Sequence, residues 1–316
     1  MRHIDASAVH AALTYPALIE RLRETFLEGG EVPLRQHYGI ANPDGAPGTL
    51  LVMPAWQSGG HIGIKMVSVY PDNPRQGLPS VIGAYMLFDA RNGAPKAVID
   101  GVALTQRRTG CASALAAGYL ARRDAHSLLM VGAGALAPHL VRAHLAVRRY
   151  GLLTLWNRDA AKAEALASSL ADLPKDGPVR IRVMPDLEAA VRQADVISCA
   201  TLSHAPLIHG AWLKPGAHVD LVGGFTPHMR EADDEAVRRA TVFVDTRSGA
   251  LHEAGDITQP LANGSLRESD IAGDLFDLVR GDAPGRRSED QITLFKSVGF
   301  ALEDLAAAEL ACELTA

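Results

Sequence analysis

A glycine-rich turn between two short apolar runs is the first feature of this sequence that could do chemistry. Residues 128–131 lead into Gly132-Ala-Gly134-Ala-Leu-Ala137, and a helical pattern then connects to a second apolar run at 152–156. Gly132 permits a tight turn, Gly134 lets the backbone approach a pyrophosphate, and Ala137 lets the helix lie close to the sheet. The segment predicts a dinucleotide-binding strand–turn–helix–strand unit, with a plain glycine turn as the alternative.

The helix after this turn should begin near Ala135 and Leu136, where free N–H groups and the positive end of the helix dipole favour phosphate. The second apolar run ends in Asn157-Arg158, where NAD sites usually have an acid that binds the ribose. An amide beside a guanidinium can bind a 2′-phosphate instead, and Lys162 adds charge. We therefore expect NADP(H), with NAD(H) as the alternative if Asp159 takes the ribose.

Lys65 is the next candidate, because it lies within an apolar run, His61-Ile-Gly-Ile-Lys-Met-Val67, that has the pattern of a strand. Burial lowers the pKa of an ammonium, which can then bind a carboxylate or exchange a proton. The alternative is a strand-edge lysine that reaches water.

Arg108 opens a predicted Ala-rich helix over residues 105–121, which Thr105 would cap. If that helix packs, either Arg107 or Arg108 must point away from solvent; a capping or ion-paired arginine is the alternative. Spacing alone assigns no role to Arg35, and Ser80 can be simply a turn residue.

The whole chain has the size and composition of a two-domain enzyme. It has 316 residues, of which 47% are hydrophobic and 21% charged, with a net charge of −5. Without a basic run, nucleic acid and anionic membranes are not expected partners. The three cysteines show no metal-ligand spacing and fit a reducing cytoplasm, and no apolar leader or membrane span is apparent.

The elements that must hold these residues fall into two groups. Helical periodicity over residues 5–30 ends at Gly29-Gly30 and is followed by strand-like runs that predict an antiparallel sheet, with a hairpin turn at 89–93. These runs are 50–56, 61–70, 80–90 and 95–101.

Strands and helices then alternate, which predicts an α/β fold with a Rossmann doubly wound parallel sheet. The expected strands are 127–131, 152–156, 179–183, 195–200, 217–222 and 241–245, and the expected helices are 135–149, 159–171, 186–193 and 232–239. Residues 256–271 look loop-rich. We predict an α+β substrate and dimerisation domain at 1–122, a dinucleotide domain at 123–298, and a last helix, 299–316, that returns to the first domain.

Several segments in order resemble the ornithine cyclodeaminase/μ-crystallin family. They are GIKMVSVYPDNPRQGLPSV (63–81), LTQRRTGCASALAAGYLAR (104–122), VGAGALA, LWNR and ITLFKSVGFALEDLAAA (292–308), which span nearly the whole chain. The resemblance implies a homodimer joined through the sheet domain and a Rossmann domain that binds NAD(H) or NADP(H).

By the same resemblance, Arg35, Lys65 and Arg108 would hold a substrate carboxylate, and Ser80 would lie beside substrate and nicotinamide. The residues that would line the cofactor are Thr109, Thr201, Leu202 and Ser297 to Gly299.

The departure from this family is Phe225. Cyclodeaminases have, after the glycine pair, an aspartate thought to engage the amine of ornithine, and a phenyl ring cannot accept a proton. The segment Phe225 to Glu231 resembles instead the subgroup that reduces 1-pyrroline-2-carboxylate and 1-piperideine-2-carboxylate to L-proline and L-pipecolate. Phe225 would then bind the apolar edge of the ring, although a packing substitution with the cyclodeaminase function retained is the alternative.

This interpretation predicts that Lys65 and Arg108 are catalytic, orienting the carboxylate, and that Lys65 or a water supplies the proton. An ornithine cyclodeaminase remains the second hypothesis, with Glu231 or Asp256 in place of the aspartate. Amino-acid dehydrogenation is a further variant, and a cofactor-bound binding protein without turnover is the third hypothesis. His204 and His228 are expected to be surface loop residues.

Overall fold

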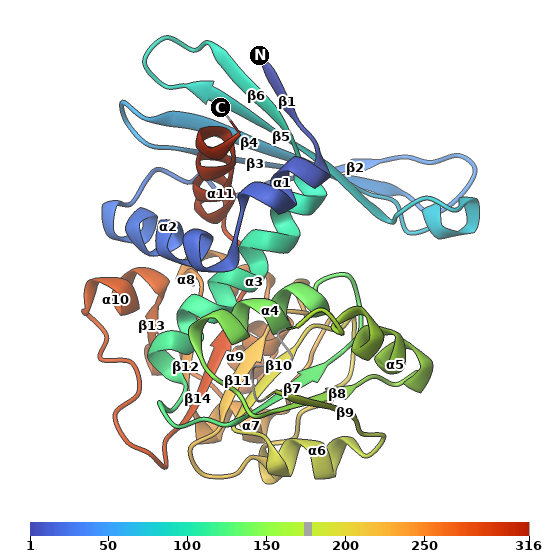
Figure 1. The fold of residues 1–316 in the computed structure, drawn as a ribbon, viewed down its shortest axis with the longest axis vertical. Helices are drawn as coiled ribbons and strands as arrows, with labels where there is room; N and C mark the ends of the chain where they lie inside the picture. Colours follow the sequence, from blue (N-terminus) through green and yellow to red (C-terminus); the bar gives the residue numbers. More distant parts are fainter. Residues whose placement is uncertain (174–178, 316) are drawn as a thin grey trace. The chain divides into compact units, whose positions relative to one another are not determined.

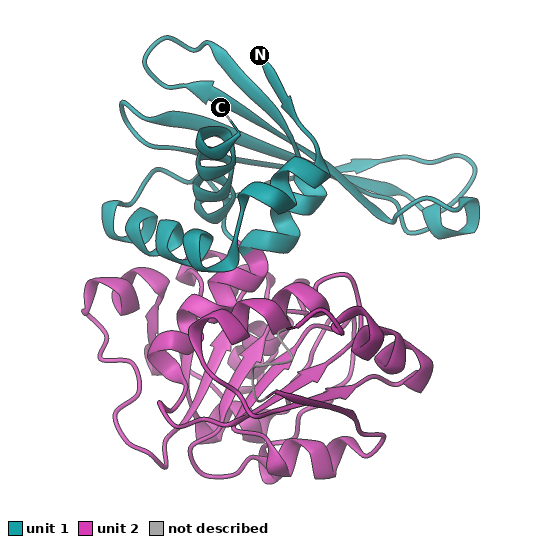
Figure 2. Cartoon of the chain, viewed as in Figure 1, with its two compact units in different colours: residues 1–108, 300–316 teal, residues 109–299 magenta. Residues whose placement is uncertain are grey.

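The protein is described by a computed structural model that covers residues 1–173 and 179–315. The chain divides into two compact units, coloured separately in Figure 2: residues 1–108 with 300–316, and residues 109–299. The first boundary lies inside helix α3 (Gly101–Leu120), whereas the sequence suggested residue 122. The reason is that α3 is continuous: Arg108 pairs with side chains of the first unit, and Gly110 packs against the backbone of His139 in the second.

The first unit is built on a six-stranded sheet of order β1-β6-β5-β4-β3-β2. Strands β2 to β6 are antiparallel neighbours, and β1 pairs parallel with β6. Strands β3 to β6 match the four predicted runs, whereas β1 and β2 were not predicted. The strands are β1 (Arg2–Ile4), β2 (Gln36–Ile40), β3 (Gly48–Trp56), β4 (His61–Val69), β5 (Val81–Asp89) and β6 (Pro95–Asp100). Helices α1 (Ala6–Ala12), α2 (Tyr15–Glu28) and α11 (Ala301–Leu314) belong to this unit, and α11 packs on β3, β4, β5 and α2 (Figure 1).

The register of this sheet decides where Lys65 points. Lys65 pairs with Met53 on β3 and with Tyr85 on β5, and all three side chains are buried. Because successive side chains of a strand point to opposite faces, Met66 lies on the other face, where it is exposed. The charged residue of the strand therefore lies on the buried side of its sheet.

Two sequence predictions in this unit need correction. The helix predicted over 105–121 begins at Gly101, because the Asp100 carboxylate accepts from the Ala103 N–H at 2.8 Å and so caps the first turn. Thr105 is therefore not a cap; its hydroxyl donates to the Gly101 carbonyl within the helix. The helical stretch expected over 5–30 is two helices, α1 and α2.

The second unit confirms the predicted doubly wound parallel sheet but extends it. Eight strands lie in the order β13-β12-β14-β11-β10-β7-β8-β9, and all neighbouring pairs are parallel. They are β7 (Ser127–Val131), β8 (Leu152–Trp156), β9 (Arg180–Val183), β10 (Val196–Cys199), β11 (His218–Leu221), β12 (Ala240–Val244), β13 (Ile271–Asp274) and β14 (Ile292–Lys296).

Strands β13 and β14 were not predicted, and the last of them, β14, inserts between β11 and β12. The segment expected to be loop-rich holds helix α9 (Gly255–Asn263). The other helices of the unit are α4 (Ala137–Val147), α5 (Ala160–Ser169), α6 (Leu187–Gln193), α7 (Asp234–Arg239), α8 (Arg247–Glu253) and α10 (Leu275–Arg280). Short 3-10 turns lie at Asn73–Gln76, Gly210–Trp212 and Glu268–Asp270.

The sheet of the second unit is buried on both faces. Alternate residues of β7 enter different core clusters: Leu128 and Met130 pack with α4, whereas Leu129 and Val131 pack with the side of α6 and α7. Strand order also reverses beside β7, since β8 follows on one side and β10 on the other. In such sheets ligands bind in the crevice at the carboxyl ends of the strands at this switch point.

Cys111, Cys199 and Cys312 are buried and form no disulfide. None of the helices in the described part of the chain is both long and apolar enough to span a bilayer.

Candidate functional site

The first unit buries a cluster of two cations and two carboxylates. The Lys65 ammonium lies 2.7 Å from Asp304 Oδ2, and the Arg108 guanidinium donates to Asp304 Oδ1 at 2.9 Å and to Glu303 Oε2 at 2.8 Å. All four side chains are less than a tenth exposed. Asp304 thus bridges the two cations, and β4, α3 and α11 each supply part of the cluster.

Burial sets the protonation of this cluster. It lowers the pKa of Lys65 to about 8, an effect that Asp304 opposes and that Arg108 reinforces. Burial by itself would raise the pKa of Asp304, but Arg108 and Lys65 together hold it below its usual value. At neutral pH the cluster therefore contains an ammonium whose proton can be released by a small rise in pH.

The other predicted residues of this unit lie at different distances from the cluster. Arg35, half-buried just before β2, is near enough for its charge to lower the pKa of Lys65. Ser80 does not lie beside Lys65 within this unit. Its carbonyl accepts from the Tyr70 N–H at the end of the β4–β5 hairpin. Tyr70 is five residues after Lys65, which separates the two backbones by roughly 16 Å at the rise of a strand. Tyr85 lies directly opposite Lys65, and burial raises the pKa of its phenol.

Glu303 and Asp304 are functional candidates that the sequence analysis missed. The sequence predicted helix α11 but assigned no role to its acids, and both lie in a stretch that is buried throughout, residues 301–312. Buried acids are rare unless paired, so two adjacent acids in the first turn of a largely apolar helix were the available signal. Their partners could not be identified from the sequence, because Arg108 and Asp304 are 196 residues apart.

The glycine turn of the second unit has the geometry expected of a phosphate cradle. Gly132 has φ of 103°, and a Cβ there would lie 2.5 Å from the carbonyl oxygen of Ala200, so only glycine fits. A Cβ at Gly134 would meet open space, and Ala135 beside it is exposed. Helix α4 follows with Leu136 as N-cap and no side-chain cap. Pro138 has no N–H, and the N–H groups of Ala137 and His139 donate to the carbonyls of Gly134 and Leu136 at 3.0 Å each, so an anion would be bound by the turn before the helix.

The end of β8 presents the residues predicted to choose between cofactors. Arg158 and Lys162 are exposed, the latter in the first turn of α5. The Asn157 amide donates to the Asp159 carbonyl at 2.9 Å, and the Asp159 carboxylate accepts from Ala161 N at 3.1 Å as the N-cap of α5. Asp159 therefore has a structural task, and the two cations remain directed to solvent.

The predicted cofactor-lining residues of the second unit follow the ends of its strands, except Thr109, which is buried in α3. Thr201 and Leu202 come directly after β10, and Leu202 is 68% exposed. Ser297 to Gly299 follow β14, where the Asp245 carboxylate accepts from the N–H groups of Val298 and Gly299 at 2.7 Å each. These segments all lie at the carboxyl edge of the sheet, where the switch point predicts a ligand.

Phe225 follows β11 after the glycine pair and is 43% exposed. A single exposed aromatic ring is ordinary on a protein surface, so its exposure by itself assigns Phe225 no role. His204 is exposed, and its ring contacts the His228 carbonyl at 3.1 Å, so it is a loop residue as expected; His228 is exposed as well.

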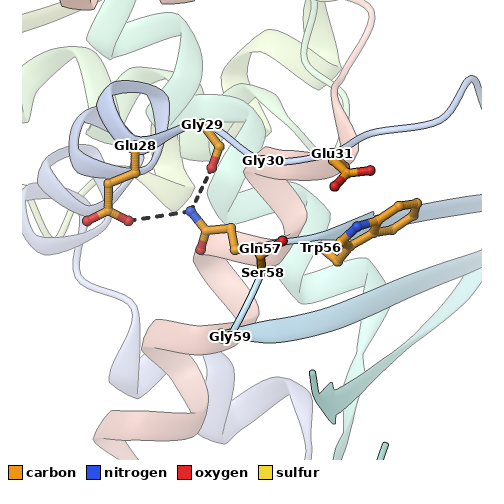
Figure 3. A pocket seen from close by; sticks show the side chains of 9 residues that line it. Glu28, Gly29, Gly30, Glu31, Trp56, Gln57, Ser58 and Gly59 are labelled. Carbon is orange, nitrogen blue, oxygen red and sulfur yellow. Dashed lines mark hydrogen bonds between the residues drawn. The ribbon is translucent and has the colours of Figure 1, made fainter. Parts of the chain in front are cut away.

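A separate hollow of about 420 Å³ lies in the first unit, between the end of α2 and the β3–β4 turn (Figure 3). Gln57 crosses it and donates to the Gly29 carbonyl at 2.8 Å. Glu28 and Glu31 line it without a cation, so it would repel a carboxylate substrate. None of the predicted site residues lines this hollow, and we do not assign it to the site.

Comparison with known proteins identifies relatives that match most of this chain. The model of the ornithine cyclodeaminase/mu-crystallin family matches residues 7–315. Among curated relatives, a Delta(1)-pyrroline-2-carboxylate reductase of Paracoccus denitrificans is 42% identical over 260 residues, which cover 82% of this chain and 81% of the relative.

Two solved structures share the fold over its full length. A Delta(1)-pyrroline-2-carboxylate reductase of Thermococcus litoralis, in complex with NADH and L-proline, superposes with a TM-score of 0.93 at 33% identity and covers 100% of this chain and 97% of its own. An archaeal alanine dehydrogenase dimer with bound NAD has a TM-score of 0.90 at 27% identity, covering 100% and 96%.

Proposed function

This chain belongs to the ornithine cyclodeaminase/mu-crystallin family, and we propose that it is an NAD(P)H-dependent reductase of cyclic ketimines. Its substrates are 1-pyrroline-2-carboxylate, 1-piperideine-2-carboxylate or both, and its products are L-proline and L-pipecolate. The observation that carries the proposal is the combination of a buried Lys65–Arg108 cluster with Phe225 in place of an acid. The relatives named as pyrroline-2-carboxylate reductases support the same reaction.

A bound reduced nicotinamide supplies the hydride for such a reduction. The hydride adds to the imine carbon, the C=N electron pair moves to nitrogen, and one proton on nitrogen completes the secondary amine. Positively charged groups that orient the carboxylate would align the ring for this attack, a positioning effect worth on the order of 7 kcal/mol at best. We assign that task to Arg108 and Lys65, with Arg35 beside them.

Lys65 is also our candidate for the proton donor. Its pKa of about 8 keeps it in the ammonium form at neutral pH while making its proton easier to release than that of an exposed lysine. Asp304, 2.7 Å away, then holds the nitrogen in place through the proton transfer. A water oriented by Lys65 is the alternative donor.

Phe225 supports reduction over the cyclodeaminase alternative. A cyclodeaminase needs a group that engages the side-chain amine of ornithine, and Phe225 offers none. Glu231 and Asp256, the two substitutes considered from the sequence, are both fully buried and hydrogen-bonded inside the second unit. Both carboxylates already bind groups of the second unit, Glu231 the N–H of Thr201 and Asp256 the ammonium of Lys296.

The cofactor is a nicotinamide dinucleotide, and we propose that NADP(H) is preferred. Arg158 and Lys162 are exposed at the end of β8, where a 2′-phosphate would lie. Asp159 caps α5 through its carboxylate, which argues against its serving as the ribose-binding acid of NAD enzymes. The solved relatives that contain NADH or NAD show that the fold also accepts the unphosphorylated form in other proteins.

We also propose that the protein acts as a homodimer through the sheet of its first unit. The face of β4 and β5 away from Lys65 carries Ile64, Met66, Ile82 and Met86, and Met66 and Ile82 are exposed. An apolar sheet face of this kind is typical of a protein interface. The expected result is a dimer mass in light scattering, and a monomer over the working concentration range would contradict it. The buried cysteines, which form no disulfide, agree with a cytoplasmic location.

The decisive experiment follows the oxidation of NADPH and NADH by purified protein with each ring imine, beside an ammonia assay with ornithine. We expect oxidation with at least one imine and no ammonia. Release of ammonia from ornithine, with neither imine reduced, would replace this proposal with the cyclodeaminase, and tight NADPH binding without any turnover would favour a binding protein.

Lys65→Met tests the site itself. A lost general acid typically costs 10²- to 10⁴-fold in rate, so we expect turnover to fall by about that factor while NADPH fluorescence quenching is retained. Lys96→Met, at an exposed lysine of β6, is the matched control and should leave turnover unchanged. Unchanged turnover in Lys65→Met would remove this residue from the mechanism.

A further inference from the structure

The second unit contains its own buried charged cluster, which the proposed reaction does not use. Lys296 ends β14, and its ammonium lies 3.1 Å from the Asp256 carboxylate in the first turn of α9. The same ammonium donates to the carbonyl oxygen of Gly223, directly after β11. Both charged side chains are fully buried.

Glu231 joins this cluster from the segment that follows Phe225. Its Oε1 accepts from the N–H of Thr201 at 2.7 Å, from the Thr201 hydroxyl at 2.7 Å and from the Cys199 thiol at 3.1 Å. Its backbone N–H donates to Asp256 Oδ1 at 2.8 Å, which links the two carboxyl residues. Glu231 Oε2 makes no hydrogen bond within the described part of the chain, so this oxygen can hold a proton when the group is neutral.

These contacts converge on the segments that follow two neighbouring strands. Thr201 follows β10, and the pair Gly223-Gly224 follows β11. A Cβ at Gly223 would lie 2.5 Å from Glu231 Oε1, and one at Gly224 would lie 2.6 Å from the Asp256 carboxylate. The glycine pair therefore rests directly on the cluster, and any displacement of the carboxylates must move the backbone that leads to Phe225.

We propose that Glu231, held by Lys296 and Asp256, is a positioning residue for nicotinamide binding. It fixes Thr201 and the Gly223-Gly224 turn, and its ionised form favours binding of the oxidised cofactor over the reduced one. The inference rests on the proposed function, because Thr201 is taken to line the nicotinamide site. It adds a role for a residue that touches neither substrate nor cofactor.

The charge balance of the cluster supports the proposed effect of Glu231 ionisation on cofactor binding. Two carboxylates, Glu231 and Asp256, face one ammonium, Lys296, and the Cys199 thiol and the Thr201 hydroxyl complete the polar surroundings of Glu231. Burial raises the pKa of Glu231 to about 7; Lys296 opposes that shift and Asp256 adds to it. The carboxyl group of Glu231 therefore takes up a proton more readily than that of an exposed glutamate.

The sign of the linkage follows from the charge of the ring. The oxidised nicotinamide carries a positive charge that the reduced ring lacks, so it is stabilised by an ionised Glu231. By linkage, affinity for the oxidised form should fall as pH falls through the pKa of Glu231, whereas affinity for the reduced form should change less. Binding of the oxidised cofactor should also release protons near pH 7.

Equilibrium binding of NADH and NAD⁺, and of NADPH and NADP⁺, to the whole protein at pH 6 and pH 8 tests both parts. For the wild type we expect the ratio of the Kd for the oxidised form to that for the reduced form to fall several-fold from pH 6 to pH 8. In Glu231→Gln this dependence should disappear, while the Kd for the reduced form stays within about threefold, because the amide oxygen still accepts from Thr201. Glu188→Gln, at an exposed carboxylate of α6, is the control that should behave as the wild type.

Glu231→Ala removes the acceptor altogether, and we expect it to raise the Kd of the reduced form by tenfold or more, with rescue by Gln. A Glu231→Ala protein that binds like the wild type overturns the positioning role, and a pH-dependent ratio that persists in Glu231→Gln overturns the ionisation role. If Glu231→Ala fails to fold, Glu231→Gln alone tests the inference. A folded Gln variant that has lost its affinity for the reduced cofactor would also overturn it.

Failure of the proposed function is recognised separately. If NADPH and NADH are not oxidised in the presence of either imine, but the ratio of the two Kd values changes with pH as expected, the reductase proposal fails and the role of Glu231 stands. If imines are reduced and Glu231→Gln keeps the pH-dependent ratio, the role of Glu231 fails alone. No binding of any nicotinamide cofactor by the wild type would overturn both.

Discussion

Each unit of this chain buries a cluster of charged side chains, and the two clusters differ in charge balance. In the first unit two cations, Lys65 and Arg108, meet two carboxylates on α11. In the second unit one cation, Lys296, meets the carboxyl groups of Asp256 and Glu231. Desolvation disfavours the charged form of each group, so it lowers the pKa of Lys65 to about 8 and raises that of Glu231 to about 7.

The difference teaches that burial can bring a pKa towards neutrality from either side, because it disfavours an ammonium and a carboxylate alike. The first cluster holds side-chain cations, which suits binding and protonating an anionic substrate. The second holds backbone segments at the ends of β10 and β11, which suits shaping a cofactor site. Four predictions separate these roles, beginning with the largest expected effect.

Asp304→Ala should be the most damaging change, because it leaves two buried cations without the carboxylate that bridges them. Loss of one partner from a buried ion pair typically costs about 3–5 kcal/mol, so we expect the free energy of unfolding to fall by about that amount. Urea unfolding measures it. Glu313→Ala removes an exposed acid of the same helix, paired with Arg21, and should cost about 1 kcal/mol or less; equal losses in the two variants would show that the first cluster is not special.

Asp304→Asn keeps the shape and removes the charge, and it should shift the pH profile. The negative charge of Asp304 raises the pKa of Lys65, so its removal should lower that pKa, by about 1–3 units for a contact of this length. With Lys65 as the proposed proton donor, its ammonium form is the active one. The kcat/KM of the wild type should then fall above pH 8, and the variant should lose activity at correspondingly lower pH. An unchanged alkaline limb would assign the proton to another group.

Arg158→Ala tests whether the second unit governs binding rather than turnover. A hydrogen bond to a charged group is worth about 1.5–3 kcal/mol, so the Kd for NADPH should rise about 10- to 100-fold while the Kd for NADH is unchanged. Titration of cofactor fluorescence measures both. Arg180→Ala, an exposed arginine at the start of β9, serves as control. Equal weakening of both cofactors would contradict a 2′-phosphate contact.

Phe225→Ala should have the smallest effect, because the ring is already 43% exposed. Truncating a half-buried aromatic side chain removes about 1 kcal/mol of apolar contact, which corresponds to roughly a fivefold loss in kcat/KM for the ring imine. Phe225→Leu should recover most of that loss. If both variants keep full activity, the phenyl ring is a surface substitution and not a wall of the substrate site.

Much of this arrangement was evident in the amino-acid sequence because it depends on local rules. The glycine turn, the alternation of strands and helices and the apolar strand around Lys65 are all short-range patterns, and each was found at or near its predicted place. The start of α3 was misplaced because the Asp100 cap was overlooked in favour of Thr105. Phe225 was also visible as a departure from a motif, without any knowledge of its surroundings.

Tertiary structure alone decided which charges meet. Glu303 and Asp304 pair with side chains from far earlier in the chain, and the insertion of β14 between β11 and β12 is what brings Lys296 beside Asp256 and Gly223. A buried ion must find its partner within a few ångströms, yet its partner's position in the sequence is arbitrary once the chain has folded back. Sequence periodicity therefore determined the faces on which these residues lie, and the strand order determined their partners.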